Sequence, residues 1–281
     1  MLIPLRLLAA LPLPLLHALG WLLGTLVFPW RRRAQDVRDN LRQAGLDAPG
    51  MARRANAGVA KGVLESLAIW LRPFPRAMRL VREVHGLEHV EAARAAGKGV
   101  LVLEPHLGNW ELGGLYLGQH LPITFLYRPA RQAWADALTR RGRERGGVRL
   151  ATPDVKGVRA MLQALKRGEG VGVLPDQVAS KGDGVWAPFF GRPAFTPTLT
   201  FRLIAATGAV PLILFCERLP WGRGFRLHIL PAPALPDEPV AAATRLNAAI
   251  EALIRRHPDQ YLWTYRRYKR PHDAPPPEPA P

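Results

Sequence analysis

The chain has 281 residues, and Lys and Arg outnumber Asp and Glu by 39 to 22, a formal net charge of +17. That charge favours an acidic partner, such as nucleic acid, an anionic membrane or an acidic protein. Cys216 is the only cysteine, which excludes an internal disulfide and a thiol-rich metal site and favours a reducing compartment.

The N-terminal segment points to a membrane among these partners. Residues 7–29 contain no charged side chain, and roughly 20 apolar residues are the length that a membrane-spanning helix needs. Pro12 and Pro14 interrupt the pattern, and three arginines follow at 31–33, as they do on the cytoplasmic side of a span. We therefore predict a membrane anchor at residues 1–30, the alternative being a buried hydrophobic helix of the globular domain.

The rest of the chain reads as alternating helices and strands. Residues 34–71 have helical periodicity, and two prolines at 73 and 75 end that stretch. Apolar runs predict strands at 81–85, 99–104, 123–128, 148–151, 170–175 and 209–217, with an edge strand at 225–231. Helices are predicted at 86–97, 131–145, 155–167 and 196–207, and from Pro239 onward.

This alternation predicts a single α/β domain over residues 31–270. Its central sheet is expected to be mostly parallel or mixed, with helices flanking it. Thr196 and Pro197 suit the N-cap and first position of the helix predicted at 196–207. The proline-rich end, 271–281, predicts a disordered tail.

One histidine stands five residues before a glutamate in EPHLGNWELGG, residues 104–114. On a continuous helix, five residues turn through about 500°, so the two side chains would diverge. Here a strand ends before His106, and Asn109 is a natural N-cap for a following helix. His106 therefore lies at the carboxyl end of a strand, where open α/β sheets place their sites. A bend at Gly108 can bring the Glu111 carboxylate back to the imidazole.

Such a pair would form a general-base dyad. A carboxylate on one ring nitrogen fixes the tautomer and leaves the other nitrogen to accept a proton. The alternative is that Glu111 only favours a helix N-terminus and that His106 caps a turn. Spacing alone does not separate the two.

Several other chemistries are excluded by the motifs they require. The sequence has no G-x-S-x-G, no H-E-x-x-H and no glycine-rich nucleotide loop. Cys216 lies in an apolar strand, which suits an inert core thiol. No metal site is predicted. A histidine base without a protein nucleophile implies direct attack by a hydroxyl group of the substrate.

Four segments in this order resemble the late acyltransferases of lipid A biosynthesis, within the wider H-x4-D/E lysophospholipid acyltransferase group. They are HLGNWE, YRP followed by RRGRERGG, LPDQ with KGDGVWAPFFGRPAFTPT, and HPDQYLWTYRRYK. The similarity extends from about Arg31 to Arg270.

The resemblance implies an acyltransferase that moves a fatty acyl chain from acyl carrier protein to a hydroxyl of a glucosamine-based lipid A precursor. It implies no cofactor, no covalent acyl-enzyme, and a place on the cytoplasmic face of a bacterial inner membrane with its anionic lipids. His106 is then the base and Glu111 its partner. The matching segments also assign supporting or substrate-binding roles to Asn109, Arg128, Arg143, Asp176 and Gln177.

Two departures from the family pattern leave the acceptor and the acyl length open. Gln132 and Ala133 stand where Asn-Pro is common, and Tyr265 stands where histidine is common. One alternative is an acyl-CoA-dependent enzyme acting on another glycolipid, such as a phosphatidylinositol mannoside. A remote one is a non-catalytic basic protein that binds membranes or nucleic acid, but the basic residues form no aromatic-interleaved stripe.

Overall fold

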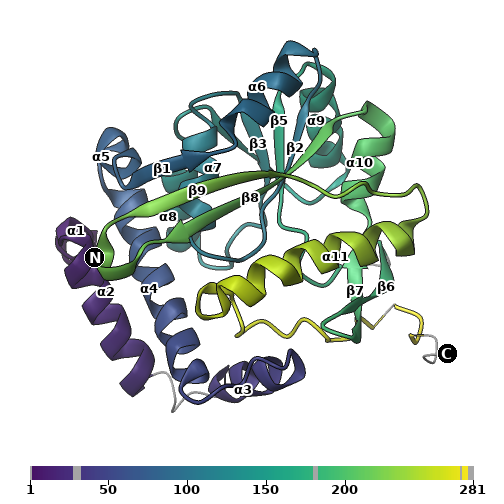
Figure 1. Ribbon diagram of the computed structural model, residues 1–281. Helices are drawn as coiled ribbons and strands as arrows, with labels where there is room; N and C mark the ends of the chain where they lie inside the picture. Colours follow the sequence, from purple (N-terminus) through teal and green to yellow (C-terminus); the bar gives the residue numbers. More distant parts are fainter. Residues whose placement is uncertain (1, 28–32, 180–182, 273, 278–281) are drawn as a thin grey trace.

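A single central sheet with helices on both faces forms the body of the protein (Figure 1). The computed structural model describes residues 2–27, 33–179, 183–272 and 274–277. In this described part, seven strands form the sheet in the order β1-β9-β8-β2-β5-β3-β4. They are β1 (Val81–His85), β2 (Val100–Leu103), β3 (Ile123–Leu126), β4 (Val148–Ala151), β5 (Gly170–Val173), β8 (Val210–Arg218) and β9 (Phe225–Pro231).

The sheet is mixed, because β8 and β9 pair antiparallel and the other neighbouring strands pair parallel. All four residues of β2 are buried. Leu101 and Leu103 pack into the core on one face, whereas Val100 and Val102 pack into the core on the other. A strand covered on both faces reads as a continuous apolar run, as the sequence indicated. The α/β prediction is confirmed.

Helices cover both faces of this sheet. The described helices after the N-terminal segment are α3 (Arg33–Gln43), α4 (Met51–Leu71), α5 (Phe74–Met78), α6 (Leu87–Ala95), α7 (Trp110–Leu117), α8 (Ala133–Arg143), α9 (Val155–Lys166), α10 (Leu199–Thr207) and α11 (Pro239–Arg256), with short 3₁₀ turns at Pro220–Gly222 and Pro258–Gln260. The longest, α4, runs beside the N-terminal helices (Figure 1).

The N-terminal segment folds into two helices, α1 (Leu2–Ala10) and α2 (Leu13–Leu22), with a π-helical turn, η1 (Leu23–Val27), after them. Pro12 lies at the break, and the axes bend by 110° there. Within the described residues, no single helix is long and apolar enough to cross a membrane, although the bent pair meets that test by length and composition. Residues 1 and 28–30 of the predicted anchor lie outside the described residues.

This N-terminal hairpin (residues 2–27) packs against α4. Leu16 is fully buried. A Cβ on Gly24 would lie 2.5 Å from the backbone of Ala57, so η1 and α4 approach each other closely at this point. Other side chains of the hairpin face outward, with Ile3 72% and Leu7 68% exposed. The hairpin is therefore part of the core on one side and apolar surface on the other.

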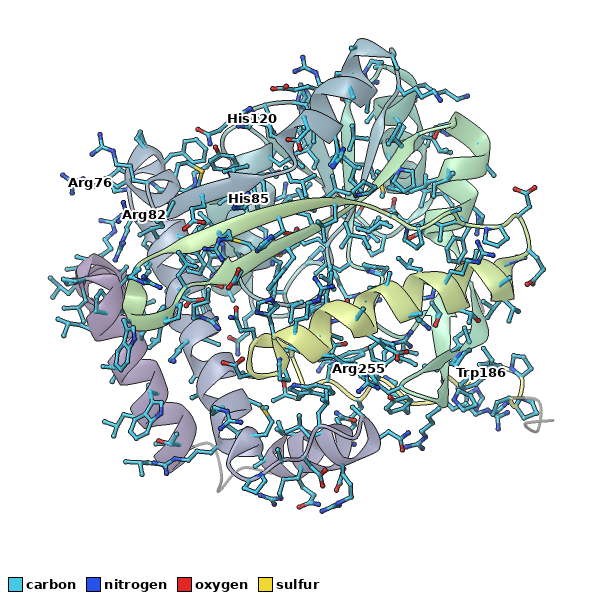
Figure 2. All side chains as sticks on the ribbon, in the orientation of Figure 1. Arg76, Arg82, His85, His120, Trp186 and Arg255 are labelled. Atoms are coloured by element: carbon cyan, nitrogen blue, oxygen red, sulfur yellow. The ribbon has the colours of Figure 1, made fainter. Side chains whose placement is uncertain are left out.

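A second, two-stranded sheet lies beside α11. Its strands are β6 (Gly184–Phe189) and β7 (Arg192–Pro197). Asn247 on α11 donates to the carbonyl oxygen of Pro188 at 2.9 Å. Figure 2 shows Trp186 of β6 near the C-terminal segment, where its indole N–H donates to the carbonyl oxygen of Pro275 at 2.8 Å. The predicted tail, 271–281, lies partly outside the described residues.

Three predictions at element boundaries were wrong. The helical stretch 34–71 is two helices, because Gly45 and Gly50 take left-handed backbone conformations between α3 and α4. Thr196 and Pro197 end β7, and α10 starts after Thr198 instead. The strand 225–231 is not an edge strand, because β1 pairs with it on its outer side.

Candidate active site

The site begins where β2 and β5 end. These strands pair parallel, and Leu103 stands opposite Val173. His106 and Asp176 each come three residues later, so the register of the sheet brings them together. The Nδ1 atom of His106 lies 2.8 Å from Asp176 Oδ1, and the backbone N–H of His106 donates to Oδ2, also at 2.8 Å.

This pairing fixes the imidazole. Asp176 is 1% exposed. Burial raises the pKa of its carboxyl, but His106 and the more distant Arg267 outweigh burial and hold the pKa below its usual value. Because an ionised carboxylate only accepts, Nδ1 carries the proton and Nε2 is left as an acceptor. The amide nitrogen of Gln177 lies 2.9 Å from Nε2 and donates to it in this arrangement.

A tight turn carries the chain from His106 into α7. Gly108 has φ +65°, and a Cβ there would lie 2.0 Å from the carbonyl oxygen of Cys216, so only glycine fits. Asn109 then caps α7, since its side-chain oxygen accepts from the N–H of Leu112 at 3.0 Å. The predicted N-cap is confirmed.

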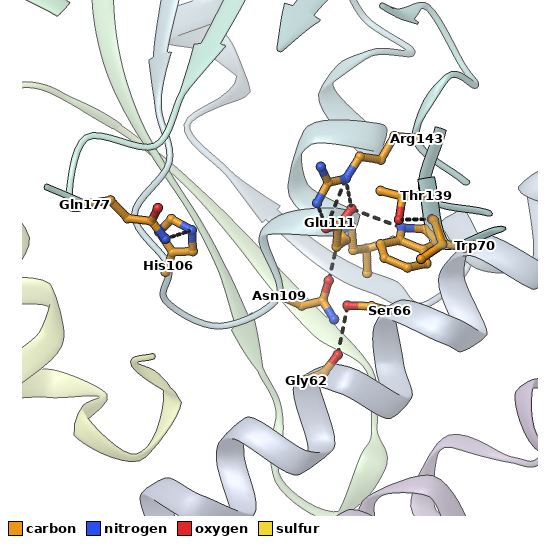
Figure 3. Close-up of polar contacts among 11 residues, drawn as sticks. Gly62, Ser66, Trp70, His106, Asn109, Glu111, Thr139, Arg143 and Gln177 are labelled. Carbon is orange, nitrogen blue, oxygen red and sulfur yellow. Dashed lines mark hydrogen bonds and ion pairs between the residues drawn. The ribbon is translucent and has the colours of Figure 1, made fainter. Parts of the chain in front are cut away.

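Glu111 does not bond to His106, contrary to the predicted dyad. Its carboxylate accepts from Arg143 Nε, at 2.8 Å to Oε2, and from Arg143 Nη2. The indole N–H of Trp70 on α4 donates to the same carboxylate at 3.0 Å. Figure 3 shows the Glu111 cluster apart from His106 and Gln177. The first turn of α7 points the Glu111 side chain toward α4 and α8, where it meets Trp70 and the guanidinium of Arg143. The carboxylate beside the His106 imidazole is that of Asp176 instead.

Arg143 remains fully charged in this setting. Burial lowers the pKa of its guanidinium, but the Glu111 carboxylate more than offsets this and raises the pKa above its usual value. The guanidinium also lies 5.4 Å from the ring centre of Tyr127 and 5.8 Å from that of Trp70. Cations over aromatic faces are stabilised by the ring quadrupole.

A cavity of about 990 Å³ joins these groups. His106, Glu111, Arg128, Arg143 and Gln177 all line it, and Arg128 is exposed at its surface. Asn109 and Asp176 lie behind this wall. The remaining lining includes an apolar part made by Leu115, Phe125, Leu126, Val148, Leu150, Val158 and Leu174. The volume is at the upper end of the range for small-molecule sites, about 300–1,000 Å³.

Glu104 is a site residue that the sequence analysis missed. It follows β2 directly, lines the cavity and is 2% exposed. Burial, with the Glu111 charge nearby, raises the pKa of this carboxyl well above its usual value, which favours the neutral acid. Its Oε1 atom has no hydrogen-bond partner among the described residues. The sequence feature that could have identified Glu104 is its position two residues before His106.

Metal ligation and thiol chemistry find no support in the described part of the chain. No group of three or more His, Cys, Asp or Glu side chains there could hold a metal ion. Cys216 is fully buried, and burial raises the pKa of its thiol well above the usual value, so it stays an unreactive thiol. The site therefore offers a histidine base, two carboxylates and two arginines.

Comparison with known sequences identifies the family of this chain. The sequence model of the bacterial lipid A biosynthesis acyltransferases matches residues 1–270. The chain belongs to this family. This acyltransferase is 32% identical over 275 residues to the lipid A biosynthesis lauroyltransferase of Escherichia coli (strain K12), covering 94% of this chain and 89% of the relative.

Two further relatives show how broad the similarity is. The lipid A biosynthesis palmitoleoyltransferase of Escherichia coli (strain K12) is 30% identical over 92% of this acyltransferase and 86% of its own length. A phosphatidylinositol mannoside acyltransferase of Mycobacterium tuberculosis (strain ATCC 25618 / H37Rv) is 33% identical, but over 61% of this chain and 55% of its own. Relatives that are named for different glycolipids are thus similar in sequence to this chain.

Proposed function

We propose that this acyltransferase moves a fatty acyl chain onto a hydroxyl group of a lipid A precursor, with His106 as the general base. The observation that carries the proposal is the hydrogen bond of 2.8 Å between His106 Nδ1 and Asp176 at the edge of a large, partly apolar cavity. Asp176, rather than Glu111, is then the partner that orients the imidazole and stabilises its protonated form.

The proposed reaction needs no protein nucleophile. The acceptor hydroxyl displaces the Gln177 amide from His106 Nε2, loses its proton to that nitrogen, and its oxygen attacks the carbonyl carbon of the acyl thioester. The tetrahedral intermediate then collapses, the carbon–sulfur bond breaks, and His106 returns the proton to the departing thiolate. General acid–base catalysis of this kind contributes about 10²–10⁴-fold.

Glu111 and Arg143 have a second role in this proposal. Arg143 uses Nε and Nη2 to hold Glu111, and it lines the same cavity as His106. We assign to Arg143 the positive charge that stabilises the developing oxyanion, because fixed donors in a site with little water are effective there. Glu111 holds the guanidinium in place. Arg128, at the cavity surface, is suited to an acceptor phosphate.

The charge of the chain and the names of the relatives support the partners and the location that we propose. Acyl carrier protein is small and acidic, and a chain with a net charge of +17 attracts it electrostatically. Two relatives are named for lipid A biosynthesis. We place the protein at the cytoplasmic face of the bacterial inner membrane, held through the exposed apolar side of the N-terminal hairpin and by anionic lipids.

The test is mass spectrometry of membrane lipids from cells that lack the gene and carry the wild-type chain or His106→Ala. The wild type should add the mass of one acyl group to a glucosamine lipid, whereas His106→Ala should lower that product by at least about 10²-fold. The control is His85→Ala, since this histidine is exposed on β1, 59% at the side chain (Figure 2). An unchanged lipid A profile with the wild type present would refute the acceptor.

A second acceptor has support from one comparison, the 33% identity to a phosphatidylinositol mannoside acyltransferase. An acyl-CoA donor belongs with that alternative. The same lipid extracts decide the point, because an inositol-containing product would carry the new acyl group instead of a glucosamine lipid.

A further inference from the structure

A second buried polar cluster lies next to the site without lining its cavity. It consists of His17 on α2, Glu65 on α4, Asn109 before α7 and Arg218 at the end of β8. These side chains are 6%, 1%, 2% and 7% exposed, respectively. Buried polar groups are costly unless they are hydrogen-bonded, and buried charges are costly unless they are also paired, so four buried polar side chains from four elements call for a physical explanation.

Arg218 balances the charge of Glu65. Its Nη2 atom donates to Glu65 Oε2 at 2.8 Å, and its Nε atom donates to Oε1. Burial raises the pKa of the Glu65 carboxyl, but the charge and hydrogen bonds of Arg218 outweigh burial and hold the pKa well below its usual value. Glu65 is therefore ionised and acts only as an acceptor.

An acceptor at this place fixes the orientation of the Asn109 amide. The Nδ2 atom of Asn109 donates to Glu65 Oε2 at 3.0 Å, which leaves Oδ1 to accept from the N–H of Leu112. A flipped amide would put an NH₂ group against that N–H and an oxygen against the carboxylate. Glu65 thus selects the one orientation that caps α7.

The same helix controls the start of α7 at a second point. Glu65 and Trp70 both lie on α4: the first holds Asn109, and the second donates to Glu111 at 3.0 Å. Figure 3 shows α4 running beneath Asn109 and Glu111, with the Ser66 hydroxyl donating to the carbonyl oxygen of Gly62 on the same helix. Two contacts from α4, at Asn109 and at Glu111, therefore hold the turn after His106 in place.

The carboxylate of Glu65 also contacts the N-terminal hairpin. His17 Nε2 lies 2.6 Å from Glu65 Oε1, although the ring N–H makes no aligned hydrogen bond among the described residues. The hairpin is tied to α4 elsewhere by Arg72, which donates to the carbonyl oxygens of Ala9 at 2.7 Å and Leu11 at 2.6 Å. One carboxylate therefore touches both the hairpin and the catalytic turn.

We propose that Glu65 is a positioning residue for acyl transfer: it orients Asn109, and with it the turn from His106 to Glu111, and it couples this turn to the N-terminal hairpin through His17. This inference rests on the proposed function. Glu65 touches no reacting atom, and it acts through Asn109. The hairpin is then a structural part of the catalytic site as well as an apolar surface.

The experiment compares two double variants that both remove the buried charges. Glu65→Gln with Arg218→Met keeps an acceptor for Asn109, whereas Glu65→Leu with Arg218→Met has none at nearly the same volume. Transfer to the lipid acceptor is measured on purified full-length protein. We expect kcat to be at least about tenfold lower in the leucine variant, with both KM values within about twofold, because a misplacement of about 1 Å in a catalytic group costs up to about 10²-fold.

A second pair tests the link to the hairpin and does not disturb the ion pair. His17→Ala removes the contact with Glu65 Oε1 and should lower kcat, whereas His17→Gln, which keeps a polar group at this place, should restore it. Ser66→Ala, on the same helix as Glu65, is the control and should behave as the wild type. If the two members of each pair had the same kcat, the positioning role of Glu65 would be overturned. A wild-type protein that transfers no acyl group to this acceptor would instead refute the proposed function.

Discussion

The pair of His106 and Asp176 makes the sharpest prediction, through the substitution Asp176→Asn. The change preserves the shape of the side chain and removes its charge. Asp176 now accepts two hydrogen bonds from the same residue, each at 2.8 Å. Asparagine has one acceptor oxygen, so its NH₂ group must face either the backbone N–H or Nδ1 of His106.

The expected loss follows from the distance between the charges. When Nε2 takes the proton, the positive charge of the ring lies about 4 Å from the carboxylate, and two unit charges at that distance interact by about 4 kcal/mol at an effective dielectric constant of 20. Each 1.36 kcal/mol is a tenfold change in rate. Asp176→Asn should therefore lower kcat by about 10³-fold.

The measurement is single-turnover acyl transfer by the purified variant, with thermal unfolding to show that it is folded. KM for both substrates should change little, because Asp176 lies behind the cavity wall. Asp39→Asn on α3 is the control for loss of a carboxylate, since that side chain is 54% exposed. A variant within about threefold of the wild-type kcat would refute the role of Asp176 and return attention to Glu111.

Three further predictions concern the pH, the membrane and the donor. Because burial raises the pKa of Glu104, the folded state holds a proton that the unfolded state has released above about pH 4.5. The wild type then loses stability as pH rises through that window, and the melting temperature of Glu104→Gln relative to wild type should increase with pH; a constant difference would contradict the neutral acid. Leu7→Glu should weaken binding to anionic vesicles, whereas Val155→Glu, 76% exposed on α9, should not; equal binding would exclude the hairpin as the contact. Added salt should raise KM for acyl carrier protein strongly with little change in kcat; a better rate with acyl-CoA at every salt concentration would refute the carrier protein as donor.

Much of the sheet was predictable because its strands are apolar runs bounded by glycine and proline. β4 has the predicted bounds, and β2 and β5 differ from prediction only at their ends. The sequence also placed His106 after a strand and Asn109 at a helix start, since both depend on local chemistry. The strands β6 and β7 were missed because they contain prolines and little alternation of apolar and polar residues.

The pairing inside the site was beyond local reasoning. His106 and Glu111 are near in sequence, so a contact between them was the natural expectation. The actual partner, Asp176, becomes adjacent only because β5 lies next to β2 in the sheet, and strand order depends on the packing of the whole domain. Asp176 and Arg143 were named from family resemblance, but their partners were not.

The register that joins His106 to Asp176 also has a consequence for motion. Both residues extend from β2 and β5, and β2 lies inside the sheet with all of its residues buried. Amide protons in such central strands exchange only through large-scale opening, on a slow timescale. The base and its carboxylate therefore stay together from one turnover to the next. Any opening that admits the acyl chain and releases the product must therefore come from parts of the cavity lining outside these strands, such as the exposed Arg128 and the side chain of Gln177.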